Sequence, residues 1–241
     1  MRWMALTWMM MLAGCVTVVG PARQQPAPQQ PAPAARAAPA AAETPTPAQE
    51  RQFVAIVRSV EPVAERECRA RTQGTNCDFR ILVDDRPGRP PNAFQTLDKT
   101  GRPILAFNLA LIAQAANADE LAFVMAHEAA HHIAGHISRQ QQNSAAGALI
   151  LGGLTALTGA GSGAVDSAAD LGASVGARSY SKNYELEADA LGTVIAHAAG
   201  YDPVRGAEFF NRIPDPGNRF LGTHPPNAQR INTVRRVAAG L

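Results

Sequence analysis

The feature that most constrains the fold of this 241-residue chain is an H-E-x-x-H pattern formed by His127, Glu128 and His131. It lies in the stretch Asn117–His136, which we predict to be one helix because apolar residues recur there at spacings of three and four. Asn117 is a suitable N-cap, and Glu120 three residues later completes a capping-box arrangement. Four residues advance a helix by slightly more than one turn, so the two histidines are expected to share one face.

Two imidazoles held in this way suit a tetrahedral Zn²⁺ ion. Glu128, beside them, is then placed to take a proton from a metal-bound water. The alternative is a surface helix with two unrelated histidines, but the capping and the periodicity favour the metal site.

A catalytic zinc ion needs a third protein ligand, and a second helical stretch at 183–199, closed by Gly200, offers one. Glu185 and Asp189 stand at positions i and i+4 of this stretch and therefore share a face. Glu185 would complete a His-His-Glu ligand set, and Asp189 would accept the second ring N–H of a ligating histidine and fix its tautomer. An exposed acidic face is the alternative for this segment taken alone.

The chain resembles the HtpX and CAAX-prenyl-protease type of zinc metallopeptidase over about residues 50–241, and is most similar to the soluble periplasmic members of the BepA and LoiP type. The resemblance implies an α+β, zincin-like fold that is mainly helical with a small antiparallel sheet or hairpin. The motifs that carry it are H-E-x-x-H, Glu185-Leu186-Glu187-Ala188-Asp189, His224-Pro225, Arg230-Ile231 and Asn92-Ala93-Phe94.

Carried over by position, the resemblance implies that His127, His131 and Glu185 bind one Zn²⁺ per chain, with Glu128 as the general base and Asp189 supporting a ligand. It also implies that His224 can approach the metal and keep the enzyme quiet, although a loop or capping role is an equal alternative. The remaining histidines are expected to be structural or exposed, namely His132, His136 and His197.

Three residues are candidates for stabilising an oxyanion, namely Tyr184, His224 and Arg230. For Arg230, a salt bridge to the acidic helix is an equally good interpretation. In zinc peptidases of this build, the substrate backbone adds alongside an edge strand above the metal. We expect that strand to be formed by Ala93, Phe94, Gln95 and Thr96.

The N-terminal part of the chain is predicted to serve export and anchoring. Residues 1–15 combine one Arg with an apolar run too short to cross a membrane, as in a signal peptide. They end in Leu-Ala-Gly-Cys, which resembles a bacterial lipobox with Cys15 as the lipidated residue; an ordinary signal peptide with a chance Cys is the alternative. Residues 16–49 are rich in Pro, Ala and Gln and are predicted to be an unfolded tether.

Within the globular part, residues 53–64 have helical spacing, with Pro62 marking a kink or restart. Alternation at 79–83 predicts a strand, and the segments 93–97 and 103–107 predict a hairpin. We expect another helix over 204–213.

Cys68 and Cys77 are expected to form a disulfide in an exported chain, worth about 2–3 kcal/mol. Zinc binding by this pair is the less favoured alternative. The uncharged stretch 145–165 is long enough for a membrane span, but a crossing would place ligands of one metal on opposite sides of the bilayer. A buried hairpin or a mobile flap is favoured, and a membrane-touching surface stays open.

The charge balance limits the partners. The chain has 22 basic and 20 acidic residues, and no basic stripe or aromatic set indicates nucleic acid.

Taken together, these features of the sequence predict a lipid-anchored periplasmic zinc endopeptidase, on the outer membrane, acting on misfolded or stalled envelope proteins. The alternatives are a noncatalytic, zinc-stabilised assembly factor for outer-membrane proteins and a metal-dependent hydrolase of a non-peptide bond such as a cell-wall amide.

Overall fold

The computed structural model describes residues 44–179, 181–219 and 222–241. The predicted signal peptide, Cys15 and all but the end of the predicted tether lie outside these residues. Helix α1 (Pro47–Arg71) starts three residues before the expected beginning of the domain. Thr46 caps this helix in a capping box with Gln49, and Pro47 occupies the first turn, where the missing N–H has no cost.

Helix α1 is continuous through Pro62, so of the kink or restart expected at this residue, the restart is wrong. Its apolar face, which includes Phe53, Ile56 and Val60, is buried in the domain core and supports the helix across the proline. A disulfide between Cys68 and Cys77, with Cα atoms 5.7 Å apart, joins the end of α1 to the segment before the first strand.

Three strands form a sheet in the order β1–β3–β2, and they are β1 (Arg80–Asp84), β2 (Ala93–Leu97) and β3 (Pro103–Asn108). The predicted hairpin of β2 and β3 is present, but β1 pairs with β3 in parallel, so the sheet is mixed rather than antiparallel. Strand β3 is the most buried of the three and takes the centre. Strand β2 is consequently an edge strand.

The helix that carries the H-E-x-x-H pattern is α3 (Ala118–Ile133), preceded by the short helix α2 (Leu109–Gln114). Asn117 caps α3 as expected, through the N–H of Glu120. The Glu120 carboxylate does not complete the capping box; it is buried and binds Arg212 and the N–H of Ala116. The prediction that α3 reaches His136 is wrong, because Gly135 adopts a left-handed conformation (φ 66°) and starts a new helix.

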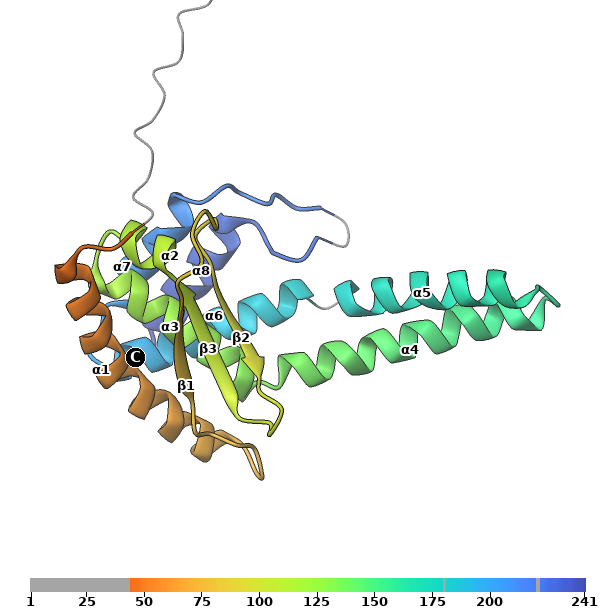
Figure 1. Ribbon diagram of the computed structural model, residues 1–241, viewed down its shortest axis with the longest axis horizontal. Helices are drawn as coiled ribbons and strands as arrows, with labels where there is room; N and C mark the ends of the chain where they lie inside the picture. The colour runs from red at the N-terminus through yellow and green to blue at the C-terminus, as the bar shows by residue number, and fades with distance from the viewer. Residues whose placement is uncertain (1–43, 180, 220–221) are drawn as a thin grey trace, which may run out of the picture. The chain divides into compact units, whose positions relative to one another are not determined.

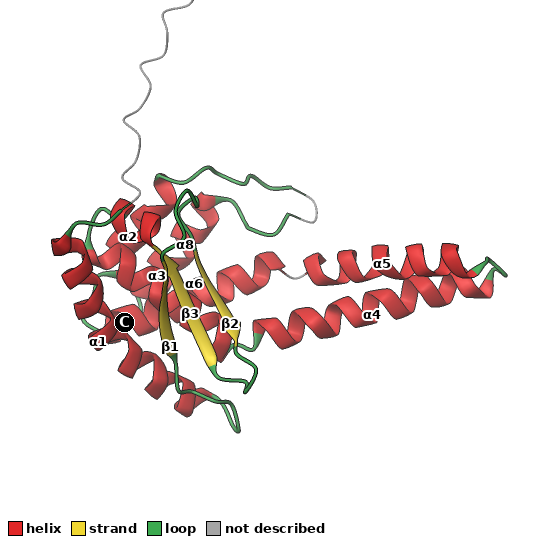
Figure 2. Cartoon of the chain, viewed as in Figure 1, coloured by secondary structure: helices red, strands yellow, loops and turns green. Residues whose placement is uncertain are grey.

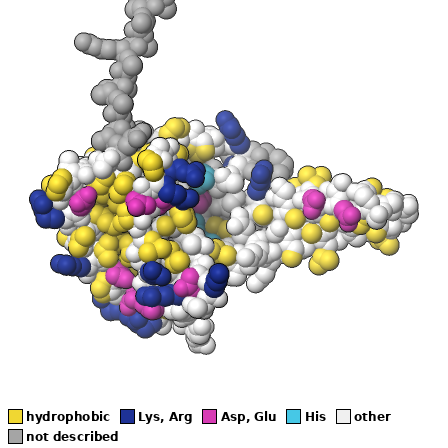
Figure 3. Space-filling view, viewed as in Figure 1, with side chains coloured by type: hydrophobic (Ala, Val, Ile, Leu, Met, Phe, Trp, Pro, Cys, Tyr) yellow, Lys and Arg dark blue, Asp and Glu magenta, His cyan; other side chains and the backbone are white. Residues whose placement is uncertain are grey.

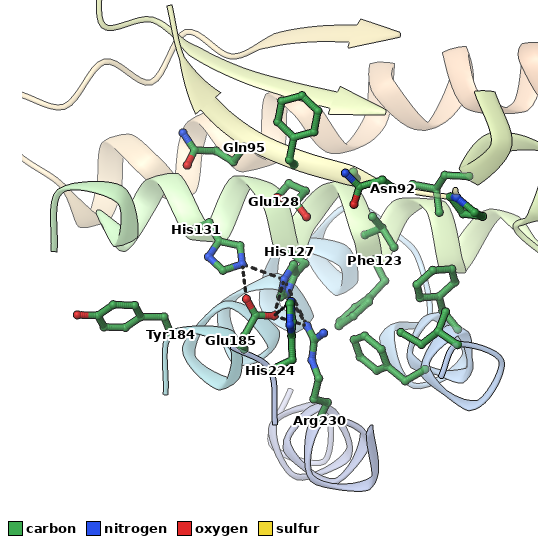
Figure 4. A pocket seen from close by; sticks show the side chains of 18 of the residues that line it. Asn92, Gln95, Phe123, His127, Glu128, His131, Tyr184, Glu185, His224 and Arg230 are labelled. Carbon is green, nitrogen blue, oxygen red and sulfur yellow. Dashed lines mark hydrogen bonds and ion pairs between the residues drawn. The ribbon is translucent and has the colours of Figure 1, made fainter. Parts of the chain in front are cut away.

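Helix α3 lies at the centre of the domain and is buried on nearly all sides. The sheet covers one side, and α6 (Ser181–Ala198) and α8 (Asn227–Ala238) lie on the other, as Figures 1 and 4 show. Instead of one helix over 204–213, a short α7 (Pro203–Gly206) is followed by a 3₁₀ helix, η1 (Ala207–Asn211). The mainly helical α+β fold is therefore confirmed (Figure 2).

Helices α4 (His136–Leu157) and α5 (Ser162–Ser179) pair along their length and extend away from the sheet and α3 as an arm (Figure 1). The expectation that 145–165 is a buried hairpin is wrong, since this stretch exposes Leu149, Leu154 and Leu157. The two helices approach so closely at Gly147 and Gly172 that an added Cβ would lie about 2 Å from the opposing carbonyl oxygen. Among the helices of the described residues, none is both long enough and apolar enough to cross a membrane.

Candidate metal centre

The candidate site lies where α3 and α6 pass each other. Helix α3 contributes His127, Glu128 and His131, and α6 contributes Glu185. Close approach of the helices depends on Gly192, where a Cβ would lie 3.0 Å from the backbone nitrogen of His127. The small residue thus lets residues that are more than fifty positions apart in sequence meet across the interface.

The three predicted metal ligands converge on one point (Figure 4). The Nε2 atoms of His127 and His131 are 2.9 Å apart. The Glu185 carboxylate oxygens lie 3.6 Å from the His127 Nε2 and 3.5 Å from the His131 Nε2. A tetrahedral zinc ion with ligand bonds of about 2.0–2.1 Å requires its ligand atoms to be about 3.3 Å apart. The residues therefore fit a zinc ion bound by two imidazoles and one carboxylate.

The electrostatics of the site also favour a bound cation. Burial acts to lower the pKa of His127, but the Asp189 and Glu185 carboxylates prevail and raise the pKa to about 9. Burial lowers the pKa of His131 to about 3, which keeps this ring neutral with a lone pair available. Burial disfavours ionisation of Glu185, yet His127 and Arg230 together lower its pKa. The carboxylates of Asp189 and Glu185 therefore stabilise a positive charge at His127, which is either a proton on the ring or a bound metal ion.

Behind His127, Asp189 and Arg230 form a buried pair. The Asp189 Oδ1 lies 3.0 Å from the His127 Nδ1, which fits the predicted role of fixing the tautomer. Arg230, on α8, donates two hydrogen bonds to Asp189, of 2.8 and 2.6 Å, and its guanidinium lies over the ring of Phe210. Its Nη2 is also 3.3 Å from Glu185. The geometry thus contains the salt bridge that was one of the two interpretations of Arg230.

Glu128 faces the sheet side of the site, next to β2 (Figure 4). Its side chain is partly buried, and this burial raises its pKa to about 7. A cavity of about 700 Å³ opens here and is lined by Glu128, the three candidate ligands, and Ala93, Phe94 and Gln95 of β2. Thr96, the last residue of the predicted substrate strand, does not line it. Histidine and acidic side chains are visible in a hollow beside the arm (Figure 3).

The two remaining predicted site residues differ in their placement. His224, in the loop before α8, lines the cavity, with its Nε2 4.0 Å from the Glu185 Oε2 and half of its side chain exposed. Tyr184 also lines the cavity, but its ring stacks on His136 and its hydroxyl accepts a hydrogen bond from Asn143. Figure 4 shows the Tyr184 ring pointing away from the metal ligands, which does not support an oxyanion role.

The sequence did not single out His136, which contacts the candidate ligand His131, or Glu187, which contacts His136. His136 is buried with its Nδ1 2.7 Å from the Nδ1 of His131, and Glu187 reaches the other ring nitrogen of His136. In one uninterrupted helix, residues five apart point about 140° away from each other. The sequence signal for this contact was Gly135, a residue that commonly ends a helix.

An H-E-x-x-H helix whose glutamate lies next to an edge strand, together with a glutamate from a second helix, defines a zinc-dependent metalloprotease. Comparison with known proteins places the protein more narrowly. Residues 50–238 match the model of peptidase family M48, and the chain belongs to this family. The members of this family are zinc-dependent metallopeptidases in general.

Individual relatives agree with this assignment. The chain is 28% identical over 168 residues to the mitochondrial metalloendopeptidase OMA1 of Saccharomyces cerevisiae, covering 66% of this chain and 46% of that protein. It is 29% identical over 151 residues to the beta-barrel assembly-enhancing protease of Escherichia coli O157:H7 (54% and 29% covered). It is 33% identical over 156 residues to the putative beta-barrel assembly-enhancing protease of Vibrio cholerae (56% and 30% covered). The chain therefore spans less than half the length of these relatives.

Proposed function

We propose that this protein is a zinc endopeptidase that cleaves misfolded or stalled proteins of the cell envelope, with His127, His131 and Glu185 as the metal ligands. The observation that carries the proposal is that the ligand atoms of these three side chains all lie within 4.8 Å of one another. They line a cavity that Glu128 also lines. When bound there, zinc supplies a coordinated water of lowered pKa and polarises the scissile carbonyl.

In this mechanism Glu128 moves the proton. Its pKa of about 7, raised by burial, lets the carboxylate accept a proton from the attacking water and return it to the leaving amine. Arg230 holds Asp189, and Asp189 holds His127 in the tautomer that presents Nε2 to the site. The guanidinium, 3.3 Å from Glu185, also keeps that carboxylate ionised.

We propose that the substrate backbone lies along the free edge of β2. Among the described residues, strand β2 pairs only with β3, and Ala93, Phe94 and Gln95 line the cavity beside Glu128. Main-chain hydrogen bonds of this kind recognise an extended peptide whatever its sequence, which suits unfolded substrates. Lipid anchoring through Cys15 in the periplasm, on the outer membrane, is part of the same proposal and follows from the sequence of residues 1–15.

The test compares the purified full chain with Glu128→Gln, using unfolded casein as substrate and zinc content as a second readout. The variant is expected to retain zinc, because Glu128 is not a ligand, and to lose cleavage by a factor of about 10²–10⁴. The exposed Glu50→Gln, in the first turn of α1, is the matched control and should match the wild type. Equal cleavage by wild type and Glu128→Gln would refute the mechanism.

The same experiment separates the competing functions. A noncatalytic assembly factor for outer-membrane proteins predicts that neither the wild type nor Glu128→Gln cleaves casein, while both bind zinc. A hydrolase of cell-wall amides predicts zinc-dependent release of products from muropeptides and none from casein.

A further inference from the structure

Five residues after the metal-ligand candidate His131, the chain brings a second histidine back onto it. Helix α3 ends at Ile133, and the left-handed Gly135 turns the chain so that His136 opens α4 facing His131. The two Nδ1 atoms are 2.7 Å apart, and the ring of His136 is only 5% exposed. This contact needs the helix break at Gly135, because the backbone there has φ 66°, a conformation that is strained for any residue with a Cβ.

The hydrogen-bond roles along this contact are fixed by the site. The Nε2 of His131 lies among the candidate ligand atoms and must be unprotonated to bind a metal, so the ring proton sits on Nδ1. That N–H donates to the Nδ1 of His136, whose own proton is then on Nε2. This second N–H donates to the Glu187 carboxylate, 3.3 Å away. Every donor in the chain of three side chains thus meets an acceptor.

The outer members of the network are held in place by α4 and α6. Arg139 donates to Glu187 at 2.7 Å. The ring of Tyr184 stacks on His136, with centroids 4.7 Å apart. The guanidinium of Arg139 lies over the Tyr184 ring, 4.4 Å from its centroid. His136 therefore has a fixed position and a fixed tautomer.

We propose that His136 and Glu187 are positioning residues for metal binding, which hold His131 in the tautomer and orientation that present its Nε2 to the ion. The inference rests on the proposed ligand role of His131. It assigns to His131 a supporting chain, His136 and then Glu187, equivalent to the support that Asp189 gives to His127. Outer groups of this kind contribute about 10–100-fold to metal affinity.

The experiment measures the zinc dissociation constant of the full chain by competition with a chromophoric chelator, together with the visible spectrum of the cobalt-substituted protein. His136→Leu removes the acceptor and is expected to weaken zinc binding about 10–100-fold. His136→Asn, whose amide oxygen replaces the Nδ1 acceptor, should recover part of the affinity. Glu187→Gln, isosteric and half-exposed, should weaken binding without affecting the fold.

Two controls make the outcomes distinct. His132→Gln, on the same helix but bonded to the carbonyl of Asn76, should bind zinc as the wild type does. His131→Ala should lose binding. If His131→Ala loses zinc while His136→Leu and Glu187→Gln keep wild-type affinity and cobalt spectra, the positioning role is refuted and the proposed function stands. If the wild type itself binds no zinc, the proposed function fails, and the inference fails with it.

Discussion

Replacing Gly192 by Ala tests whether the spacing of α3 and α6 sets the metal site. An added Cβ would lie 3.0 Å from the nitrogen and 3.1 Å from the Cα of His127, and 3.3 Å from the carbonyl carbon of Ala126. All three are backbone atoms of a buried helix, so no flexible side chain can move aside. The two helices must therefore separate by a few tenths of an ångström.

The substitution has two opposing effects on the stability of the fold and one effect on zinc affinity. Overpacking costs about 1–3 kcal/mol, and alanine gains up to about 1 kcal/mol over glycine in a helix. The metal-free variant should thus lose between about 0 and 2 kcal/mol of stability. Metal–ligand distances tolerate only about 0.2 Å, so a shift of Glu185 away from His127, already 3.6 Å apart, should weaken zinc binding by at least about tenfold.

Chelator competition measures the zinc affinity of Gly192→Ala, and thermal unfolding of the zinc-free protein measures its stability. Gly153→Ala, on the exposed side of α4 with nothing within 4 Å of the added Cβ, is the control and should keep wild-type affinity. Wild-type zinc affinity in Gly192→Ala, with unchanged stability, would show that the helix spacing does not control the site.

Two further predictions concern the arm and the loop before α8. Gly172→Ala should separate α4 from α5, because its Cβ would lie 2.1 Å from the carbonyl oxygen of Gly147; faster amide hydrogen exchange across the arm is expected, whereas Gly153→Ala should slow it. His224→Ala should raise casein cleavage at equal zinc content if His224 occupies the open metal position; unchanged activity and an unchanged cobalt spectrum would contradict that role.

Predictions based on local pattern succeeded where the physical cause is local. The N-cap at Asn117 and the hairpin of β2 and β3 each depend on a few neighbouring residues, and the structure contains both. The meeting of the α3 histidines with Glu185 was also expected, because the i, i+4 spacing on two helices leaves few ways to complete a ligand set.

The failures have a common origin in long-range packing. The parallel pairing of β1 with β3 depends on which strand is most buried, a property of the assembled core. The stretch 145–165 is uncharged, as a buried segment would be, but Gly147 and Gly152 serve the contact between α4 and α5, and the leucines are left exposed. Composition alone does not distinguish these two uses of small residues.

For this protein the sequence by itself determined the chemistry: two imidazoles and an acid on one helix face, and a second acidic helix to complete the set. Only the tertiary structure decided how these groups are supported, through Gly192, Arg230 and the turn at Gly135 that returns His136 to His131. The reason is physical. Helical periodicity fixes neighbours within one turn or two, whereas a ligand's outer contacts depend on where helices end and how closely they pack.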